Sequence, residues 1–402
     1  MPVLNKGQSE CLDKLIEWWK GYNHRKQTFQ ISGLAGCGKT FLIRHLIETM
    51  DDLKFENVLF VAYVGKAAMQ MARTGLNAST IHSAIYFAVE VPKKDEFGNN
   101  IMKEGRVVLT TKFFKKPNLD PNIKLIVVDE APMVDAKVAA DLLSFKLPMI
   151  CLGDLNQLPP VIGEPFFLRK PDYTLTEIMR QKAGNPILDL AQHIIHDKFI
   201  QLKPGTYGDK LTIIKRKDFM DFYSHKLLES DVVICGKNST RDELNKTIRA
   251  LAFKARGFEG QVPDLSIGDK LICRKNNWAI EEEGINLING LVGTVQSIDF
   301  ENKGSDTIPI DFKPDFIQST FEGLKLNTKY FYGTRQYKEA LKKTPHSGEL
   351  FEFGYAITCH LSQGSQYEKV IVFSEVMGDT EYYRKWLYTA VTRASEELIL
   401  II

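Results

Sequence analysis

Residues 28–50 read TFQISGLAGCGKTFLIRHLIETM, and this stretch decides how the N-terminal part of the chain folds. Its centre, GLAGCGKT at 33–40, matches the pattern G-x-x-x-x-G-K-[ST] in full. An apolar run precedes it and a segment with helical periodicity follows it, which is the strand–loop–helix setting that the pattern requires. Glycines let backbone N–H groups surround phosphates, and the helix N-terminus adds positive potential.

The chemistry of this loop predicts a nucleotide site. The Lys39 ammonium is expected on the β- and γ-phosphates, and the Thr40 hydroxyl is expected to hold Mg²⁺. The residues of the stretch that we predict to bind the nucleotide are Gly33, Ala35, Gly36, Cys37, Gly38, Lys39 and Thr40.

The surrounding pattern predicts an α/β fold. Residues 5–22 and 40–50 carry apolar side chains at helical spacing. Strands that are apolar throughout and separated by helices are typical of a parallel sheet covered on both faces. The expected strands are 28–32, 59–64, 125–128 and 149–152.

Two polar segments directly follow these strands, where α/β sheets bind their ligands. Asp129 and Glu130 come after the run LIVV; Asp129 is expected in the Mg²⁺ shell, and Glu130 is expected to orient and deprotonate an attacking water. This favours hydrolysis over transfer to a second substrate. Gln157, in GDLNQLPP after the next strand, is a candidate sensor of the γ-phosphate.

Composition restricts the class of protein. The chain has 402 residues, 44% hydrophobic and 25% charged, with a net charge of +2, which is typical of a globular protein with two to four domains. No membrane span or secretory leader is expected. The six cysteines form no C-x-x-C pair, so we expect small buried residues in a reducing cytoplasm, that of a host cell for a phage-encoded protein.

The rest of the chain changes its pattern twice. Residues 87–122 are extended, basic and centred on a Gly-Asn turn, which predicts a β-hairpin insertion. A second α/β unit begins at about 183, and it contains a small β-barrel at 263–349, where short strands alternate with glycine turns. The other expected elements of that unit are a helix at 238–251 and strands at 232–235, 355–358, 370–373 and 398–401.

Further motifs occur in a fixed order along the chain. They are LNKGQ at 4–8, AYVGKAA at 62–68, TIHS at 80–83, LTEIMRQ at 175–181, YAITCHLSQGS at 355–365 and YTAVTRA at 388–394. Together with the phosphate loop they resemble the motifs of superfamily 1B DNA helicases of the RecD/Dda type, and more closely the compact phage Dda-like forms. Pro132 and Leu361 depart from the commoner DEASM and H-[KR]-S-Q-G patterns, and Leu361 removes one cation expected on a phosphate.

The resemblance implies two RecA-like lobes with ATP between them. It divides the chain into lobe 1A (1–86 and 123–182), a β-hairpin pin 1B (87–122), lobe 2A (183–262 and 350–402) and an SH3-like insertion 2B (263–349). It further implies an ATP- and Mg²⁺-dependent monomer that steps 5′ to 3′ on single-stranded DNA and unwinds forked duplexes. A single-strand-binding protein or replisome components in replication or repair are implied partners.

The resemblance also assigns roles to single residues. Gln8 is expected to read adenine, Gly364 to approach the nucleotide, and Arg180 and Arg393 to stabilise charge on the γ-phosphate. The residues that it places along the DNA are Tyr63, Lys66, Thr80, His82, Asn238, Arg241, Thr358, His360, Ser362 and Gln363.

Several alternatives stay open. His82 and His360 could be buried structural residues, and Asn238, Arg241 and Asn245 could cover a solvated helix. Either Phe97 or the pair Phe113–Phe114 could be the wedge of the hairpin, or that pair could anchor it. A single-strand translocase without unwinding, a DNA-binding subunit with a scaffold ATP fold, and a P-loop kinase are the competing functions.

Overall fold

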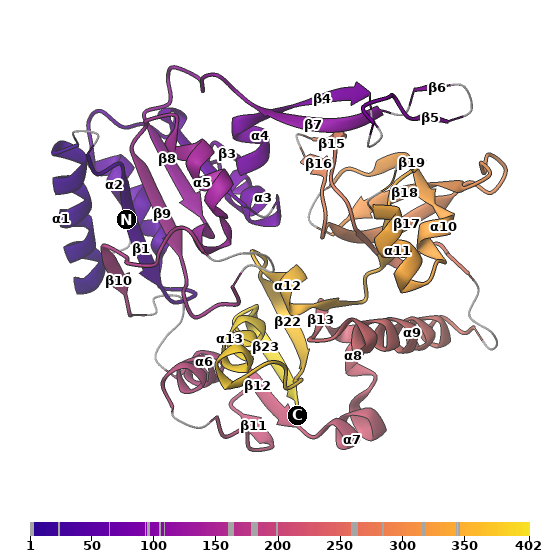
Figure 1. Cartoon of the computed structure of the whole chain (residues 1–402). Helices are drawn as coiled ribbons and strands as arrows, with labels where there is room; N and C mark the ends of the chain where they lie inside the picture. Colours follow the sequence, from indigo (N-terminus) through magenta and orange to yellow (C-terminus); the bar gives the residue numbers. More distant parts are fainter. Residues whose placement is uncertain are drawn as a thin grey trace. The chain divides into compact units, whose positions relative to one another are not determined.

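The computed structural model (Figure 1) describes the chain except residues 1–3, 23–24, 64, 93, 95–96, 104–105, 108, 160–164, 178–183, 198–199, 259–263, 284, 316–317, 343 and 345. The chain forms two compact units. The first consists of Met1–Phe87, Lys115–Tyr223 and Ser362–Ile402, and the second of Ala88–Phe114 and Ser224–Leu361.

A parallel sheet is the centre of the first unit. Its six strands lie in the order β10-β1-β9-β8-β2-β3, and each neighbouring pair is parallel. The predicted parallel sheet is therefore confirmed. The strands are β1 (Thr28–Gly33), β2 (Val58–Ala62), β3 (Ala78–Thr80), β8 (Leu125–Asp129), β9 (Met149–Gly153) and β10 (Tyr173–Leu175).

Alternating side chains of these strands enter two separate cores, because successive residues of a strand point to opposite faces. Val127 of β8 belongs to the core shared with the first group of helices, whereas its neighbours Ile126 and Val128 belong to the other core. The first group comprises α1 (Lys6–Lys20), α2 (Lys39–Thr49) and α3 (Gly65–Arg73). The second comprises α4 (Ile81–Ile85) and α5 (Ala136–Leu143), so helices cover both faces (Figure 1).

The remaining strands of the first unit come from the middle and from the C-terminal part of the chain. β23 pairs in parallel with β12 on one side and β22 on the other, and the predicted strands at 370–373 and 398–401 lie within β22 and β23. β11 was not predicted, because all of its residues are exposed and no apolar pattern marks it. The elements are α6 (Pro186–His196), β11 (Gly205–Tyr207), β12 (Leu211–Ile214), α7 (Arg216–Asp218), β22 (Tyr367–Phe373), α13 (Thr380–Val391) and β23 (Ala394–Ile401).

An antiparallel sheet dominates the second unit, in the order β19-β18-β17-β14-β20. The strands are β14 (Lys270–Cys273), β17 (Val292–Ile298), β18 (Thr307–Pro314), β19 (Phe321–Asn327) and β20 (Phe351–Phe353). Two helices in this region, α10 (Thr328–Phe331) and α11 (Arg335–Lys342), were not predicted. The side chain of Asn327 caps α10 by accepting a hydrogen bond from the Tyr330 N–H. Such a residue favours the start of a helix, but here it directly follows a strand-like apolar pattern.

The second unit also contains β13 and β21, which pair in parallel, and helix α9, as predicted. β4 and β7 form a two-stranded ribbon in the hairpin region, and β5 pairs with β6 beyond it (Figure 1). These elements are β4 (Tyr86–Pro92), β5 (Met102–Lys103), β6 (Arg106–Val107), β7 (Leu109–Lys115), α8 (Lys226–Glu229), β13 (Val232–Cys235), α9 (Asn238–Ala255), β15 (Asn277–Glu282), β16 (Ile285–Leu287), β21 (Ala356–Thr358) and α12 (Cys359–Ser362).

The structure also bears on the cysteines and on membrane-spanning helices. All six cysteines are buried, as predicted for small apolar residues. In the described part of the chain, no helix is both long enough and apolar enough to cross a membrane.

A buried ionic cluster holds together the elements of the second unit. The Glu352 carboxylate on β20 lies 3.1 Å from Arg274 Nε, 3.3 Å from Arg241 Nη2 and 3.4 Å from Lys338 Nζ. Burial raises the pKa of Glu352, but these cations outweigh it, so its pKa lies below the usual value. One carboxylate therefore balances cations from α9, α11 and the end of β14.

We predict that Glu352→Gln destabilises the protein by about 3 kcal/mol, because it leaves buried cations uncompensated. Since the pKa of Glu352 is depressed, its contribution is present at neutral pH and is lost as the pH falls through its folded pKa. Urea unfolding at pH 7 and in acid measures both effects. Glu339→Gln is the matched control, since that carboxylate is 60% exposed; equal midpoints for the two variants would refute the cluster's role.

Candidate active site

Glycine is required around the loop between β1 and α2 for two reasons, a left-handed backbone at Gly38 and close packing at Gly33. Gly38 caps α2 with φ at +80°, and a Cβ there would lie 2.5 Å from Gln8 Nε2. A Cβ on Gly33 would lie 2.6 Å from Cys37 Sγ. The loop therefore turns tightly enough for its amides and the first turn of α2 to form a phosphate cradle.

Lys39 reaches back across this loop. Its Nζ donates hydrogen bonds to the carbonyl oxygens of Gly33 at 2.8 Å and Leu34 at 3.1 Å. Burial lowers the pKa of Lys39, but the nearby Cys37, Asp154 and the Asp129–Glu130 pair outweigh it and raise the pKa above its usual value. The ammonium is thus charged and lies where the loop would surround a phosphate.

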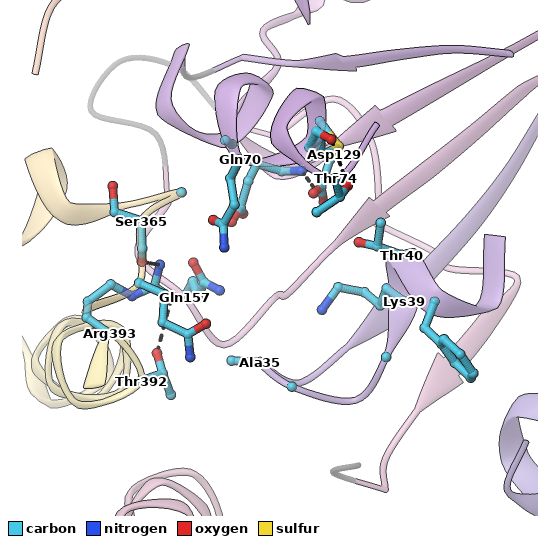
Figure 2. A pocket seen from close by; sticks show the side chains of 18 of the residues that line it. Ala35, Lys39, Thr40, Gln70, Thr74, Asp129, Gln157, Ser365, Thr392 and Arg393 are labelled. Atoms are coloured by element: carbon cyan, nitrogen blue, oxygen red, sulfur yellow. Dashed lines mark hydrogen bonds between the residues drawn. The ribbon is translucent and has the colours of Figure 1, made fainter. Parts of the chain in front are cut away.

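A pocket of about 730 Å³ opens beside the loop. Figure 2 shows Lys39 and Thr40 on one wall and Arg393, Ser365 and Thr392 of the C-terminal segment on the opposite wall. All of these residues lie in the first unit. The predicted site residues that line the pocket are Ala35, Gly36, Gly38, Lys39, Thr40, Asp129, Glu130, Gln157, Gly364 and Arg393.

The two acidic residues stand at the end of β8. Glu130 has a left-handed backbone with φ at +50°, and its N–H donates to Asp129 Oδ1 at 2.9 Å. Desolvation and the neighbouring Asp129 raise the pKa of Glu130 to about 7, against the opposing effects of Arg393 and Lys39. Desolvation likewise raises the pKa of Asp129, while Lys39 lowers it. A carboxylate whose pKa is near neutrality is suited to accept a proton from water.

Gln157 and Arg393 complete the polar wall. Gln157 is 9% exposed, and its buried Oε1 meets no hydrogen-bond donor within the described residues. Arg393 is 5% exposed; it donates from Nη1 to Ser365 O at 3.0 Å, from Nε to Thr389 O at 3.0 Å and from Nη2 to Thr392 Oγ1 at 3.2 Å. These neutral acceptors fix the guanidinium and leave its charge available to the pocket.

Other predicted nucleotide residues lie outside the pocket lining. Gln8 is fully buried; its Nε2 donates to Cys37 O at 3.0 Å and its Oε1 accepts from Asn5 N at 3.1 Å. In this structure it therefore ties the start of α1 to the phosphate loop. Gly33 and Cys37 are also not among the residues that line the pocket. Arg180 lies outside the described residues.

Sequence reasoning missed one side of the pocket. Phe41 and Arg44 on α2, Gln70 and Met71 on α3, and Thr74 just after α3 line it. Their spacing of three or four residues on each helix places them on a single face, and that periodicity is the signal that could have identified them. The Arg44 guanidinium joins the two helices by donating to Thr74 O at 2.9 Å.

Three predicted DNA residues lie together in the first unit. The Tyr63 and His82 rings are 6.0 Å apart, and His82 is 5.5 Å from the ring of Tyr86. Thr80 caps α4 by accepting from the Ser83 N–H. Burial lowers the pKa of His82, although Asp135 opposes it, so this aromatic row is neutral at pH 7. The side chain of Lys66 lies outside the described residues.

The remaining predicted DNA residues are mostly buried. Arg241 on α9 donates to Asp242 Oδ1 at 2.7 Å and belongs to the Glu352 cluster, while Gln363 donates to Leu158 O at 3.0 Å. Burial lowers the pKa of His360. Thr358 and Ser362 are buried as well, and Asn238 begins α9.

Comparison with known proteins agrees with this geometry. Residues 21–163 match a family described as AAA domain, and residues 353–401 match the UvrD-like helicase C-terminal domain. The chain is 25% identical over 423 residues to the ATP-dependent RecD2 DNA helicase of Deinococcus radiodurans, covering 98% of this chain and 48% of that protein. It is 29% identical over 276 residues to the Dda helicase of phage T4, covering 62% of this chain and 58% of that protein.

The chain is thus similar to superfamily 1B helicases of the RecD/Dda type. It spans about half the length of these two curated relatives. The structure of Pif1 helicase from Candida albicans has the same fold, with a TM-score of 0.53 at 17% identity over 100% of this chain and 94% of that one. The α/β class with a parallel sheet typical of RecA-like helicase domains is thus shown for this chain.

Proposed function

We propose that this protein is an ATP-dependent DNA helicase that moves 5′ to 3′ on single-stranded DNA and separates forked duplexes. One observation carries the proposal: a single pocket gathers a phosphate loop, an acidic pair with a raised pKa, a glutamine with an unsatisfied acceptor, and an arginine. These are the groups that hydrolysis of a nucleoside triphosphate requires.

The roles that we propose within this pocket follow from charge and position. Lys39 binds the phosphates, and Glu130 accepts a proton from the attacking water. Gln157 orients that water or senses the γ-phosphate. Arg393, with Arg180 of the motif at 175–181, stabilises the charge that develops on the transferred phosphoryl group, an effect on the order of 10³–10⁵ in rate for such arginines.

The pocket fits Mg²⁺ bound together with a nucleotide. In the described part of the chain no cluster of three or more His, Cys, Asp or Glu side chains could hold a metal alone. Thr40 and Asp129 both line the pocket and supply hard oxygen ligands, and Mg²⁺ commonly takes few protein ligands together with phosphate oxygens and water. Bound there, the ion neutralises charge on the phosphate oxygens.

Single-stranded DNA is the proposed track. Curated relatives are described as ATP-dependent DNA helicases, and a Pif1 from Bacteroides has been solved bound to single-stranded DNA. The Tyr63–His82–Tyr86 row offers neutral aromatic faces of the kind on which bases stack. Lys66 and Thr80 belong to the same motifs and are proposed to contact phosphates.

We also propose the division into lobes and insertions that the family implies. Residues 1–86 with 123–182 and residues 183–262 with 350–402 are the RecA-like lobes, whose closure on ATP drives each step. Residues 87–122 form the duplex-splitting pin, and 263–349 form an SH3-like insertion. The enzyme is proposed to act as a monomer that meets single-strand-binding or replisome proteins.

Lys39→Ala should abolish ATP hydrolysis and unwinding while leaving binding to single-stranded DNA largely intact, since the ammonium serves the phosphates and not the DNA. Hydrolysis is measured with and without single-stranded DNA, and unwinding on duplexes with a 5′ or a 3′ tail. Lys54→Ala, at an exposed lysine, is the control. Wild-type turnover in Lys39→Ala would refute the site, and preferential unwinding from the 3′ tail would refute the direction.

The raised pKa of Glu130 predicts how the rate of ATP hydrolysis depends on pH. Only its deprotonated form accepts a proton, so with a pKa of about 7 the turnover number should rise from pH 6 to 8 and then level off. Glu130→Gln should lose this rise and about 10²–10⁴ of the rate. The pH–rate profile of the exposed-site variant Glu56→Gln should match that of the wild type. A wild-type profile that is flat over this range would contradict the assignment of Glu130 as the base.

Removing residues 98–105 should impair unwinding more than translocation, because a pin acts on the duplex and not on the single-strand track. Translocation is followed by displacement of streptavidin from a single strand, and unwinding by strand release from a forked duplex. Equal loss of both activities would argue against a pin. Intact translocation by the wild type without any unwinding would instead identify a single-strand translocase.

A further inference from the structure

Helix α13 carries a tyrosine whose hydroxyl joins two loops of the pocket. Tyr388 Oη donates to Asp154 Oδ2 at 2.6 Å and accepts a hydrogen bond from the Ala35 N–H at 3.0 Å. Both side chains are buried, Tyr388 at 2% and Asp154 at 3% exposure. Burial and the Asp154 charge raise the pKa of Tyr388, so the hydroxyl keeps its proton and the bond to a carboxylate is a strong one.

The same stretch of the helix holds the loop that carries Gln157. Thr389 Oγ1 accepts from Leu158 N at 2.8 Å, and Gln363 Nε2 donates to Leu158 O at 3.0 Å. Gln157 thus lies between two positions of its loop, Asp154 and Leu158, that are both bonded to the C-terminal segment. No bond in this group is made to Gln157 Oε1, which is left for the pocket.

Arg393 depends on this stretch for its placement. Its Nε donates to the carbonyl oxygen of Thr389, the residue next to Tyr388, at 3.0 Å. The Ala35 amide is therefore linked to the Arg393 guanidinium by two hydrogen bonds, one to the Tyr388 hydroxyl and one to the Thr389 carbonyl, which are joined by the backbone of α13. Ala35 and Arg393 both line the pocket, so this link connects two of its walls.

We propose that Tyr388 is a positioning residue: its hydroxyl ties α13 to the phosphate loop and to Asp154, and thereby sets where Arg393 lies relative to the γ-phosphate. The inference rests on the proposed ATPase function. The Tyr388 ring fills a core position, and its hydroxyl makes the hydrogen bonds to the two loops. Tyr388→Phe consequently removes the two hydrogen bonds of the hydroxyl and keeps the packing of the ring.

The test is a steady-state ATPase measurement at saturating single-stranded DNA. Tyr388→Phe should lower kcat about tenfold, the effect of one hydrogen bond to a charged group, while KM for ATP changes by less than about threefold. Tyr383→Phe is the matched control, because Tyr383 lies on the same helix, does not line the pocket, and has its hydroxyl 2.7 Å from Ser374 Oγ. Its kcat and KM should equal those of the wild type.

A double-mutant cycle separates positioning from general weakening. In an Arg393→Lys background, Tyr388→Phe should lower kcat little further, since the group that it positions is already replaced. Additive losses, an unchanged kcat, or an effect confined to KM would each overturn the proposal. Should Tyr388→Phe unfold, Asp154→Asn weakens the same bond and should lower kcat in the same direction. A wild-type enzyme without DNA-stimulated hydrolysis would instead refute the proposed function.

Discussion

The parallel pairing of β1, β9 and β8 is the constraint on which the site depends. β9 lies between the other two strands, with Ser32 opposite Gly153 and Val128 opposite Cys151. Because parallel strands end at the same edge of a sheet, the phosphate loop, the acidic pair and the Gln157 loop emerge side by side. A shift in this register would separate Lys39 from Glu130 whatever the loops themselves contained.

The charged groups in the pocket influence the protonation of their neighbours. Lys39 and Arg393 face Asp129 and Glu130 where solvent is scarce, so burial and neighbouring charges together set the pKa values of Lys39, Asp129 and Glu130. Cys37, Asp154 and the acidic pair raise the pKa of Lys39, and desolvation together with the charge of Asp129 brings the pKa of Glu130 to about 7. In the function that we propose, these charges attract phosphates and let Glu130 remove a proton from water.

The C-terminal segment completes the site and does not merely cover it. Helix α13 contacts the phosphate loop through Tyr388 and the Gln157 loop through Thr389, and it is followed directly by Arg393. In the second unit a single buried group likewise connects several elements, because the Glu352 carboxylate balances cations from three of them. Both arrangements make distant stretches of chain depend on single buried groups.

The sequence by itself determined the parallel α/β sheet, the phosphate loop and the acidic pair, because these depend on local periodicity and on short motifs with their own geometry. It also indicated Gln157, which follows a predicted strand, and, through the resemblance of its motif to those of a known family, Arg393. Only the tertiary structure decided that Gln8 braces the phosphate loop, that Arg241 is bound to Glu352, and that Phe41, Arg44 and Gln70 line the pocket. The partners of a buried polar side chain come from remote elements, and no spacing along the chain encodes which of them will meet.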